Sequence, residues 1–225
     1  MGFPVFVLEH VLLAILLAAQ LMNIIGMAQA SPFDNPVEKD ALHGLKATFN
    51  DPFLNSNWIG FLCNETETSR WFGIQCASGR VTGIVLEGME LTGEIDAKAF
   101  FNLTELSILS FKNNSLKGNL MDFSDNNHLK YIDLSGNELD GAIPISLLNL
   151  NLLEALLLQD NKLTGPVPAF CQPSLKMINV SGNDLHGSIR ATRTFPSLGP
   201  DSFSGNPRLC GPPLNSCSSS LKAAI

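Results

Sequence analysis

One stretch of the sequence decides the fold, and it reads Leu129-Lys-Tyr-Ile-Asp-Leu134-Ser-Gly-Asn137-Glu-Leu139-Asp-Gly141-Ala-Ile143-Pro144. Its alternating apolar residues have the two-residue period of a short strand with one buried face. The asparagine that follows can bond backbone groups of a turn, and the glycine and proline mark the return path. A unit this small cannot bury its own apolar edge, so the pattern predicts further copies stacked on both sides.

The copies are present at a regular spacing. The residues at the asparagine position are Met89, Asn114, Asn137, Asn161 and Asn183, at intervals of 25, 23, 24 and 22 residues. A glycine precedes the last apolar position of every copy. This is the leucine-rich repeat pattern with a G-x-I-P tail. It predicts a solenoid with short parallel β-strands on the concave face, loops and 3₁₀ turns on the convex face, and a disulfide-stapled cap at each end.

The composition excludes several classes of function. The chain has 225 residues, of which 16% are charged, and a formal net charge of −7, so it lacks the basic surface that nucleic acid or anionic lipid requires. Its four histidines are scattered, and none has metal-ligand spacing with a cysteine. The sequence contains no nucleophile elbow, phosphate-binding loop or dinucleotide fingerprint. We therefore expect no catalytic residue, no metal and no cofactor.

The N-terminal 30 residues have the features of a secretory signal peptide. Residues 11–25 are nearly all apolar, and Ala28-Gln-Ala30 matches a cleavage pattern that places the mature start near Ser31. Because residues 1–10 contain no Lys or Arg, an uncleaved signal anchor is the alternative. The apolar run is shorter than the roughly 20 residues that span a bilayer comfortably, which favours cleavage. We expect a secreted or cell-surface protein.

Five cysteines fit an oxidising compartment. Two stand before the repeats and two after them. This order favours the pairs Cys63–Cys76 and Cys210–Cys217, because other pairings would have to cross the solenoid. Cys171 is left over. We expect it to be a buried free thiol at an inward apolar position, with intermolecular pairing as the alternative.

The chain is predicted to divide into five parts. They are a signal peptide at 1–30, an N-terminal cap at 31–78, five leucine-rich repeats at 79–190, a C-terminal cap at 191–217 and a tail at 218–225. In the N-terminal cap, apolar residues at 42, 45 and 49 predict a helix that Asp40 caps. The proline-rich segment from Ser197 to Cys217 breaks the repeat pattern and is predicted to seal the other end.

Residues 40–217 resemble the extracellular domain of a plant leucine-rich repeat receptor-like kinase. The match rests on the paired-cysteine caps, the L-x-G-x-I-P repeats and Ser202-Phe-Ser-Gly-Asn-Pro-Arg-Leu-Cys-Gly-Pro-Pro-Leu214. Within that group, residues 86–96 and 109–115 are similar to the pollen receptor-like kinase subfamily. The resemblance implies a right-handed solenoid, a single membrane span and an intracellular kinase.

The kinase that the resemblance implies has no counterpart in this sequence. After Cys217, residues 218–225 contain no apolar span, and the chain has no H-R-D or D-F-G motif. We therefore expect no enzymatic activity, and either a truncated receptor or a secreted ectodomain-like protein. Contact with a membrane would need an uncleaved N-terminus or a missing C-terminal span.

Function is expected on the outward side chains of the strands, which alternate with the inward leucines. Most of these side chains are small or polar, and the exceptions are of the kind that anchors a peptide or protein. We predict that a ligand contacts Lys130, Tyr131, Asp133, Leu157 and Gln159, with a peptide or another receptor ectodomain as partner. An ordinary mixed surface is the alternative for this face. For the protein, the alternative is a secreted inhibitor of a cell-wall hydrolase.

Four glycosylation sequons begin at Asn64, Asn102, Asn113 and Asn179, and each is a candidate glycan site in a secreted protein. Asn179 stands between two inward residues, so its side chain is expected on the concave face. A glycan there would block the C-terminal part of that face and would confine binding to the earlier repeats.

Overall fold

The computed structural model describes residues 34–64, 68–190 and 199–217. They belong to one compact unit that runs from Phe33 to Ile225. The predicted signal peptide at 1–30 and tail at 218–225 lie outside the described residues, as do residues 191–198 of the predicted C-terminal cap. Among the described residues, no helix is both long and apolar enough to cross a membrane.

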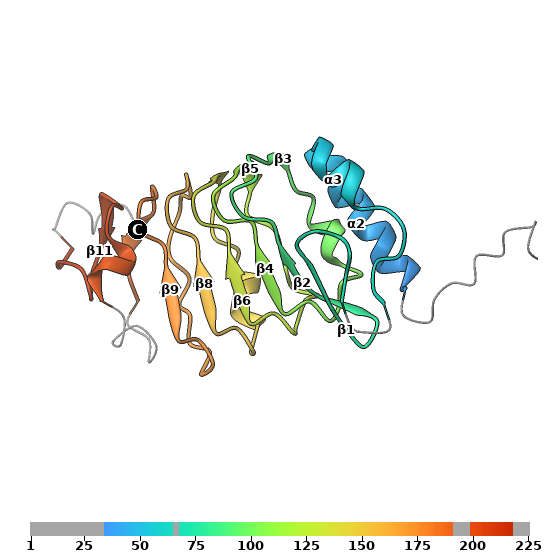
Figure 1. Ribbon diagram of the computed structural model, residues 1–225. Coiled ribbons are helices and arrows are strands. Elements are labelled where there is room, and N and C mark those ends of the chain that lie inside the picture. The colour runs from blue at the N-terminus through green and yellow to red at the C-terminus, as the bar shows by residue number, and fades with distance from the viewer. Residues whose placement is uncertain (1–33, 65–67, 191–198, 218–225) are drawn as a thin grey trace, which may run out of the picture. The chain divides into compact units, whose positions relative to one another are not determined.

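The N-terminal cap begins with helix α2 (Pro36–Phe49), which the shorter helix α3 (Pro52–Asn57) follows (Figure 1). The apolar spacing predicts α2 correctly, but Asp40 lies inside the helix and does not cap it. The cap is Asn35, whose side-chain oxygen accepts hydrogen bonds from two N–H groups of the first turn. A proline at the first helical position then fits, because the N–H group it lacks would have no helical partner there.

Two tryptophans and a disulfide hold the N-terminal cap together. Trp58 and Trp71 stack with their ring centroids 5.5 Å apart, and both are buried. Each indole N–H donates to a backbone carbonyl at 2.9 Å, so neither polar group is left unpaired. The predicted Cys63–Cys76 disulfide is present and links the preceding loop to the first strand.

The main sheet has six strands in the order β1-β2-β4-β6-β8-β9 (Figure 1). The strands are β1 (Ile74–Ala77), β2 (Arg80–Val85), β4 (Ile108–Ser110), β6 (Tyr131–Asp133), β8 (Ala155–Leu157) and β9 (Met177–Asn179). β1 is antiparallel to β2, and all other pairs are parallel. The central residue of each parallel strand is inward and buried, and these residues are Ile84, Leu109, Ile132, Leu156 and Ile178. Stacking in register therefore builds one continuous core.

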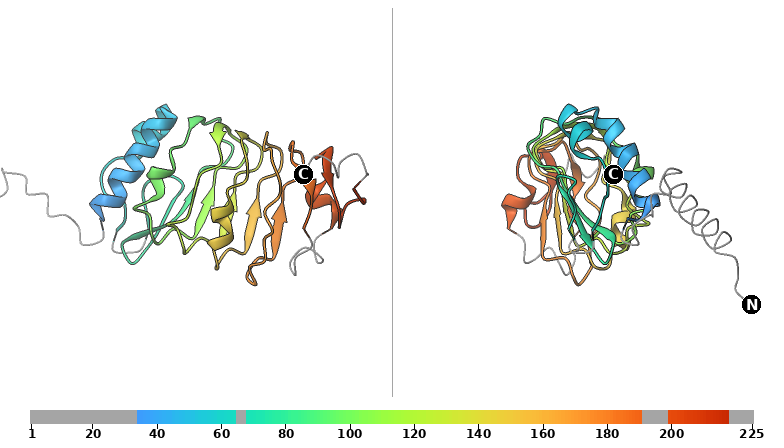
Figure 2. Two further views of the ribbon diagram at one scale, coloured as in Figure 1. Left: turned by 180° about the vertical axis from the view of Figure 1, so that it is seen from behind. Right: turned by 45° about the vertical axis from the view of Figure 1, so that its right-hand side comes forward.

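The G-x-I-P tails build further sheets beside the main one. β3 (Thr92–Glu94), β5 (Ser115–Asn119) and β7 (Glu138–Asp140) form a parallel three-stranded sheet, and β10 (His186–Ser188) pairs with β11 (Arg208–Cys210). The 3₁₀ helices are η1 (Ala97–Phe100), η2 (Ile145–Asn149) and η4 (Pro200–Phe203). η2 lies behind the main sheet in Figure 1 and comes forward in the left view of Figure 2. The predicted solenoid class is confirmed.

Each asparagine that recurs at the fixed position of the repeat bonds its own repeat to the preceding one. In Asn137, Nδ2 donates to the carbonyl of Phe111 in the preceding repeat at 2.9 Å and to that of Leu134 in its own repeat at 3.1 Å. Its Oδ1 accepts the N–H of Leu116 at 3.1 Å. Equivalent bonds are made by Asn114, Asn161 and Asn183. Met89 takes this position in the first repeat, where no earlier repeat is available for such bonds.

The C-terminal cap begins as one more repeat. Asn206 donates to the carbonyl of Val180 at 3.0 Å and accepts the N–H of Leu185 at 3.0 Å, as the repeat asparagines do. Phe203 stands three residues earlier, at the inward apolar position, and is fully buried. The expectation that this segment breaks the pattern is therefore wrong for its first half. The predicted Cys210–Cys217 disulfide closes the second half.

Cys171 is not at the inward position predicted for it, because it is exposed. Phe170 fills that position and is fully buried. The reason is the length of this repeat, in which Asn161 and Asn183 are 22 residues apart against 24 for the preceding pair. The shorter return path contains no 3₁₀ helix equivalent to η2, so the next inward position is reached one residue earlier, at Phe170.

Candidate functional site

The outward side chains of the main sheet form aligned rows across the repeats. One row contains Gly83, Ile108, Tyr131, Ala155 and Met177, and the next contains Val85, Ser110, Asp133, Leu157 and Asn179. Parallel strands in register place equivalent residues side by side, so each row runs across the strands. The first row is apolar apart from the tyrosine hydroxyl, and we call it the apolar row. The second row mixes apolar residues (Val85, Leu157) with polar ones (Ser110, Asp133, Asn179).

The apolar row is accessible to a partner. Met177 is 52% exposed, and Ile108 and Tyr131 are half-buried. Ala155 lies between Tyr131 and Met177 and contributes only a methyl group. Leu157 is half-buried in the neighbouring row. Large side chains on either side of a small one leave room for an apolar side chain of a partner.

Tyr131 and Asp133 are held in a hydrogen-bonded group. The Tyr131 hydroxyl donates to Oδ2 of Asp133 at 3.2 Å. Oδ1 of the same carboxylate accepts the hydroxyl of Ser135 at 2.6 Å and its N–H at 3.0 Å. These contacts cover Asp133, which is only 2% exposed. Asp133 therefore lies on the outward face of β6, as its place in the alternating pattern indicates. Because it is buried, it offers a ligand little contact surface. Its carboxylate instead orients the Tyr131 hydroxyl.

A second carboxylate belongs to the same group. Ser110, the register neighbour of Asp133, donates its hydroxyl to Glu87 at 2.5 Å. Burial raises the pKa of Tyr131 to about 12, and the charge of Asp133, its hydrogen bond with the phenol and the charge of Glu87 act in the same direction. The phenol is therefore neutral at any physiological pH and keeps a proton to donate.

Lys130 and Gln159 differ in their surroundings. The side chain of Lys130 is exposed, one residue before β6. On the same face Lys176 pairs with Glu154 at 2.5 Å, and this hydrogen bond and the lysine charge lower the pKa of Glu154. Gln159 is half-buried, and its side-chain oxygen has no hydrogen-bond partner among the described residues.

The structure brings Tyr131, Asp133 and Leu157 together on the neighbouring strands β6 and β8, with Lys130 and Gln159 on either side of them along the strand direction. The prediction did not include Glu87 among the contact residues. The sequence does contain a signal for Glu87. It directly follows the inward Leu86, and Gln159 occupies the equivalent position after Leu158.

The four sequons fall in different environments. Asn102 and Asn113 are exposed, and Asn64 is half-buried beside the residues outside the description. Asn179 is half-buried in β9, and its Oδ1 accepts the N–H of Ser181 at 3.0 Å. The expectation that Asn179 points to the concave face matches its place in the second row, next to Leu157.

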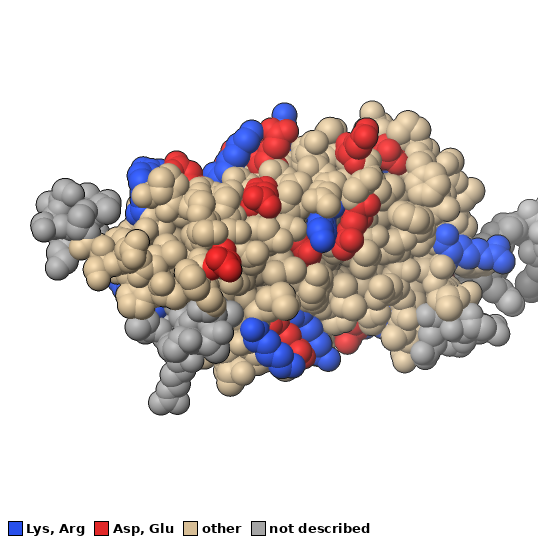
Figure 3. Space-filling model, turned by 60° about the vertical axis from the view of Figure 1, so that its left-hand side comes forward, with Lys and Arg blue, Asp and Glu red and all other residues tan. Residues whose placement is uncertain are grey.

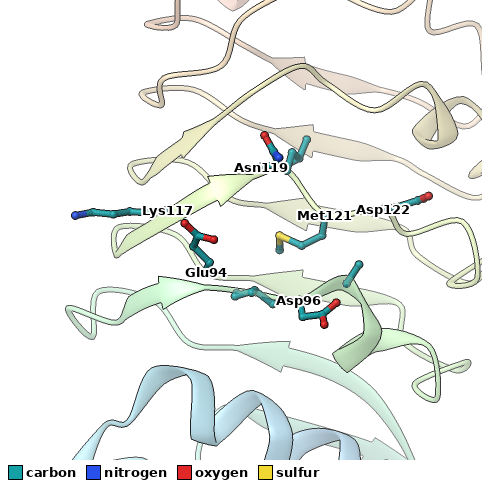
Figure 4. A pocket seen from close by; sticks show the side chains of 9 residues that line it. Glu94, Asp96, Lys117, Asn119, Met121 and Asp122 are labelled. Atoms are coloured by element: carbon teal, nitrogen blue, oxygen red, sulfur yellow. The ribbon is translucent and has the colours of Figure 1, made fainter.

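A small pocket lies away from the concave face, between β3 and β5. It has a volume of about 280 Å³, and its lining includes Glu94, Asp96, Lys117, Asn119, Met121 and Asp122 (Figure 4). The Met121 side chain points into the space between the strands, whereas Lys117 extends away from it. No group of three or more His, Cys, Asp or Glu side chains in the described residues could hold a metal ion.

Charge is spread thinly over the molecule. The face in Figure 3 shows acidic and basic side chains scattered among uncharged ones, without a broad area of one sign. The described residues thus offer a shaped, partly apolar sheet face with fixed hydrogen-bond acceptors, an arrangement suited to binding a polypeptide.

Comparison with known proteins finds similarity to plant receptor-like kinases and their ectodomains. The Leucine Rich Repeat family model matches residues 128–150, the region of the decisive stretch. Pollen receptor-like kinase 4 of Arabidopsis thaliana is 32% identical over 208 residues, which cover 81% of this chain and 30% of the relative. The chain thus spans less than a third of the length of that curated relative.

Two solved structures from Arabidopsis thaliana are similar over most of their length. The BIR2 ectodomain is 32% identical with a TM-score of 0.71, and the match covers 82% of this chain and 99% of that one. A chain of the BIR3–SERK2 complex is 32% identical with a TM-score of 0.69, covering 80% and 98%. The chain belongs to the family of leucine-rich repeat ectodomains of plant receptor-like kinases.

Proposed function

We propose that this chain is an extracellular recognition domain and that its concave face binds another polypeptide, either a peptide ligand or a second receptor ectodomain. The observation that carries the proposal is the apolar row, in which Met177 is exposed and Tyr131 half-buried on the outward face of the main sheet. Aromatic and flexible apolar side chains of this kind dominate the energetics of protein interfaces.

The similar structures support a partner of this class. One of them comes from a complex between two proteins, BIR3 and SERK2. The relatives named above are receptor-like kinases and ectodomains, which favours a receptor over an inhibitor of a cell-wall hydrolase. Catalysis would then belong to a separate kinase domain and not to these repeats.

The proposed location is the extracellular side of the plasma membrane. The apolar segment at 11–25 would direct the chain into the secretory pathway. The Cys63–Cys76 and Cys210–Cys217 disulfides support an oxidising compartment. Four sequons would add glycans, and the exposed Asn102 and Asn113 are the best placed to carry them.

The test is a pairwise binding screen of the purified chain against purified plant leucine-rich repeat ectodomains and secreted peptides. For any partner that binds, the double variant Tyr131→Ala, Leu157→Ala is expected to lose affinity by about tenfold or more, because it removes the anchors at the centre of the face. Biolayer interferometry measures the dissociation constants.

The matched control is Ile145→Ala, since Ile145 is 77% exposed in η2, behind the main sheet. It removes a similar apolar side chain without touching the concave face, so affinity should stay unchanged. Loss of binding with Ile145→Ala and retention with the double variant would place the interface on the convex side and refute the proposal.

A further inference from the structure

A second pocket lies in the N-terminal cap, outside the strands of the main sheet. Its volume is about 410 Å³, and its lining includes Ile59, Phe61, Leu62, Asn64 and Arg70. Leu62 is fully buried, whereas Ile59 is 65% and Phe61 57% exposed. The pocket therefore combines a buried apolar residue with two large apolar side chains that solvent reaches.

The exposed phenylalanines of this cap differ in their surroundings. Phe53 and Phe72 pack edge to face, with their ring centroids 5.2 Å apart. Among the described residues, Phe61 forms no such pair, and Nζ of Lys39 lies 5.9 Å from its ring centroid. Lys39 pairs in turn with Asp34 at 3.0 Å. The protein thus positions the Phe61 ring, and more than half of this residue remains accessible to a further partner.

The wall of the pocket contains an attachment point for one class of ligand. Asn64 lines the pocket and begins the sequon Asn64-Glu-Thr66. Its Oδ1 accepts the N–H of Thr68 at 3.1 Å, and its Nδ2 donates to the Thr68 hydroxyl at 2.9 Å, so the amide has a fixed orientation. An amide nitrogen carries two hydrogens, so replacement of one of them by a sugar leaves the other to donate to Thr68.

We propose that this pocket holds the first N-acetylglucosamine of an N-linked glycan on Asn64. The C–H groups on one face of the sugar pack on Phe61 and Ile59, because the electron-rich face of an aromatic ring attracts polarised C–H groups. Arg70 is exposed and forms no ion pair among the described residues, and it donates to the acetamide oxygen. A sugar, with its apolar face and polar edges, matches this mixed lining.

Attachment of the sugar follows the general chemistry of N-glycosylation. A lipid diphosphate-linked oligosaccharide is the donor. The bond between its C1 carbon and the phosphate oxygen breaks, C1 bonds to Nδ2 of Asn64, the amide loses one proton and the lipid diphosphate leaves. The inference rests on the proposed extracellular location, because this donor is met in the secretory pathway. It goes beyond that location by making the glycan a packed part of the N-terminal cap.

The test measures occupancy and stability on the full chain secreted from plant cells. Mass spectrometry of peptides should find Asn64 modified. Thr66→Ala removes the sequon and keeps Asn64 itself, and it is expected to lower the Tm by about 2 °C or more, because the packed sugar is lost. Trimming with an endoglycosidase that leaves a single N-acetylglucosamine should keep the original Tm, since the first sugar makes the contact.

Phe61→Ala tests whether the pocket is the place of contact. In that background Thr66→Ala should no longer change the Tm, because the sugar has lost the ring on which it packs. Phe53→Ala is the matched control, since Phe53 is 48% exposed in the same cap and does not line the pocket. In the Phe53→Ala background, Thr66→Ala should lower the Tm as it does in the original chain.

Three results would each overturn the inference. They are an unmodified Asn64 in the secreted chain, a Tm that Thr66→Ala leaves unchanged, and an effect of Thr66→Ala that persists after Phe61→Ala. Glycans on Asn102 or Asn113 with none on Asn64 would remove the role of the pocket and keep the proposed location. If the chain stays inside the cell and carries no glycan at any sequon, both fail.

Discussion

A single carboxylate organises the residues of the concave face. Asp133 is almost fully buried, which is rare for an aspartate, and it accepts three hydrogen bonds from Tyr131 and Ser135. Among the described residues, no cation forms an ion pair with it. The cost of burying that charge is offset by these donors, and one consequence is a tyrosine whose proton is held unusually firmly.

The titration of Tyr131 tests this picture directly, because it is the only tyrosine of the chain. Its pKa is raised to about 12, mainly by burial and then by the Asp133 charge. Ultraviolet absorbance should therefore show phenolate forming near pH 12 in the folded protein, and near pH 10 after unfolding. A folded-state midpoint near 10 would contradict the buried network.

The same shift predicts how stability changes at alkaline pH. The folded state binds the Tyr131 proton more tightly than the unfolded state does. Its contribution to stability is therefore complete below pH 10 and is lost as the pH rises from about 10 toward about 12. Urea unfolding at a series of pH values measures this loss, and Tyr131→Phe, which has no titrating proton, should remove that part of the slope.

At the scale of the elements, the repeat asparagines Asn114, Asn137, Asn161 and Asn183 form a ladder that joins each strand-turn unit to the one before it. Asn137 is 8% exposed and uses both ends of its amide on backbone groups. Such groups are costly to bury without partners. The ladder thus supplies the polar pairing that the short strands, three residues long in β6 and β8, cannot supply alone.

Asn137→Ala is expected to lower the free energy of unfolding by about 2–4 kcal/mol, because it leaves the Phe111 carbonyl and the Leu116 N–H without this partner. Urea denaturation followed by circular dichroism gives the value. Asn149→Ala is the control, since Asn149 is exposed in η2, and it should change stability by less than about 0.5 kcal/mol. Equal effects of both variants would show that the ladder contributes nothing beyond local structure.

The molecule as a whole depends on its two sealed ends. The Cys63–Cys76 disulfide closes a loop of 13 residues, next to the stacked tryptophans of the N-terminal cap. Replacing both cysteines by alanine should lower the free energy of unfolding by about 3 kcal/mol, from the loop entropy that the bond removes in the unfolded chain. Denaturation of the oxidised protein and the variant measures the difference, and no difference would mean that packing alone seals this end.

The positions of the glycans determine which parts of the molecular surface a partner can reach. We expect occupancy at the exposed Asn102 and Asn113, which leave the apolar row open. Mass spectrometry of peptides after glycosidase treatment identifies the modified asparagines. A glycan on Asn179 would cover the region next to Met177 and would exclude any ligand contact at that end of the face.

Much of this architecture could be predicted from the sequence, because leucine, asparagine and glycine recur at fixed offsets and each offset has one structural role. The prediction is wrong where the offsets change. The repeat that contains Cys171 is shorter, so the inward position falls on Phe170, and prolines interrupt the pattern of the half-repeat around Asn206. The apolar spacing of the first helix indicates which face is buried, but it does not indicate that Asn35 is the cap.

The site was less predictable than the fold. Alternation along β6 correctly places Asp133 on the outward side, but it says nothing about the hydroxyls that cover it. The hydroxyls that bond Asp133 belong to Tyr131 and Ser135, two residues before and after it in the same repeat. Alternation places all three side chains on one face, but it does not show that they bond one another. The bond from Ser110 to Glu87 joins two repeats, which no single strand pattern contains.

The asparagine ladder also bears on how such a chain can change length. Each ladder asparagine bonds only backbone groups of its neighbour, so the polar part of the joint between repeats requires no particular side chain there, provided that the inward apolar residues are kept. A segment bounded by two of these asparagines could be duplicated or lost in the gene, and the flanking repeats would find the same partners. The reach of the binding face can therefore vary by recombination while both caps stay as they are.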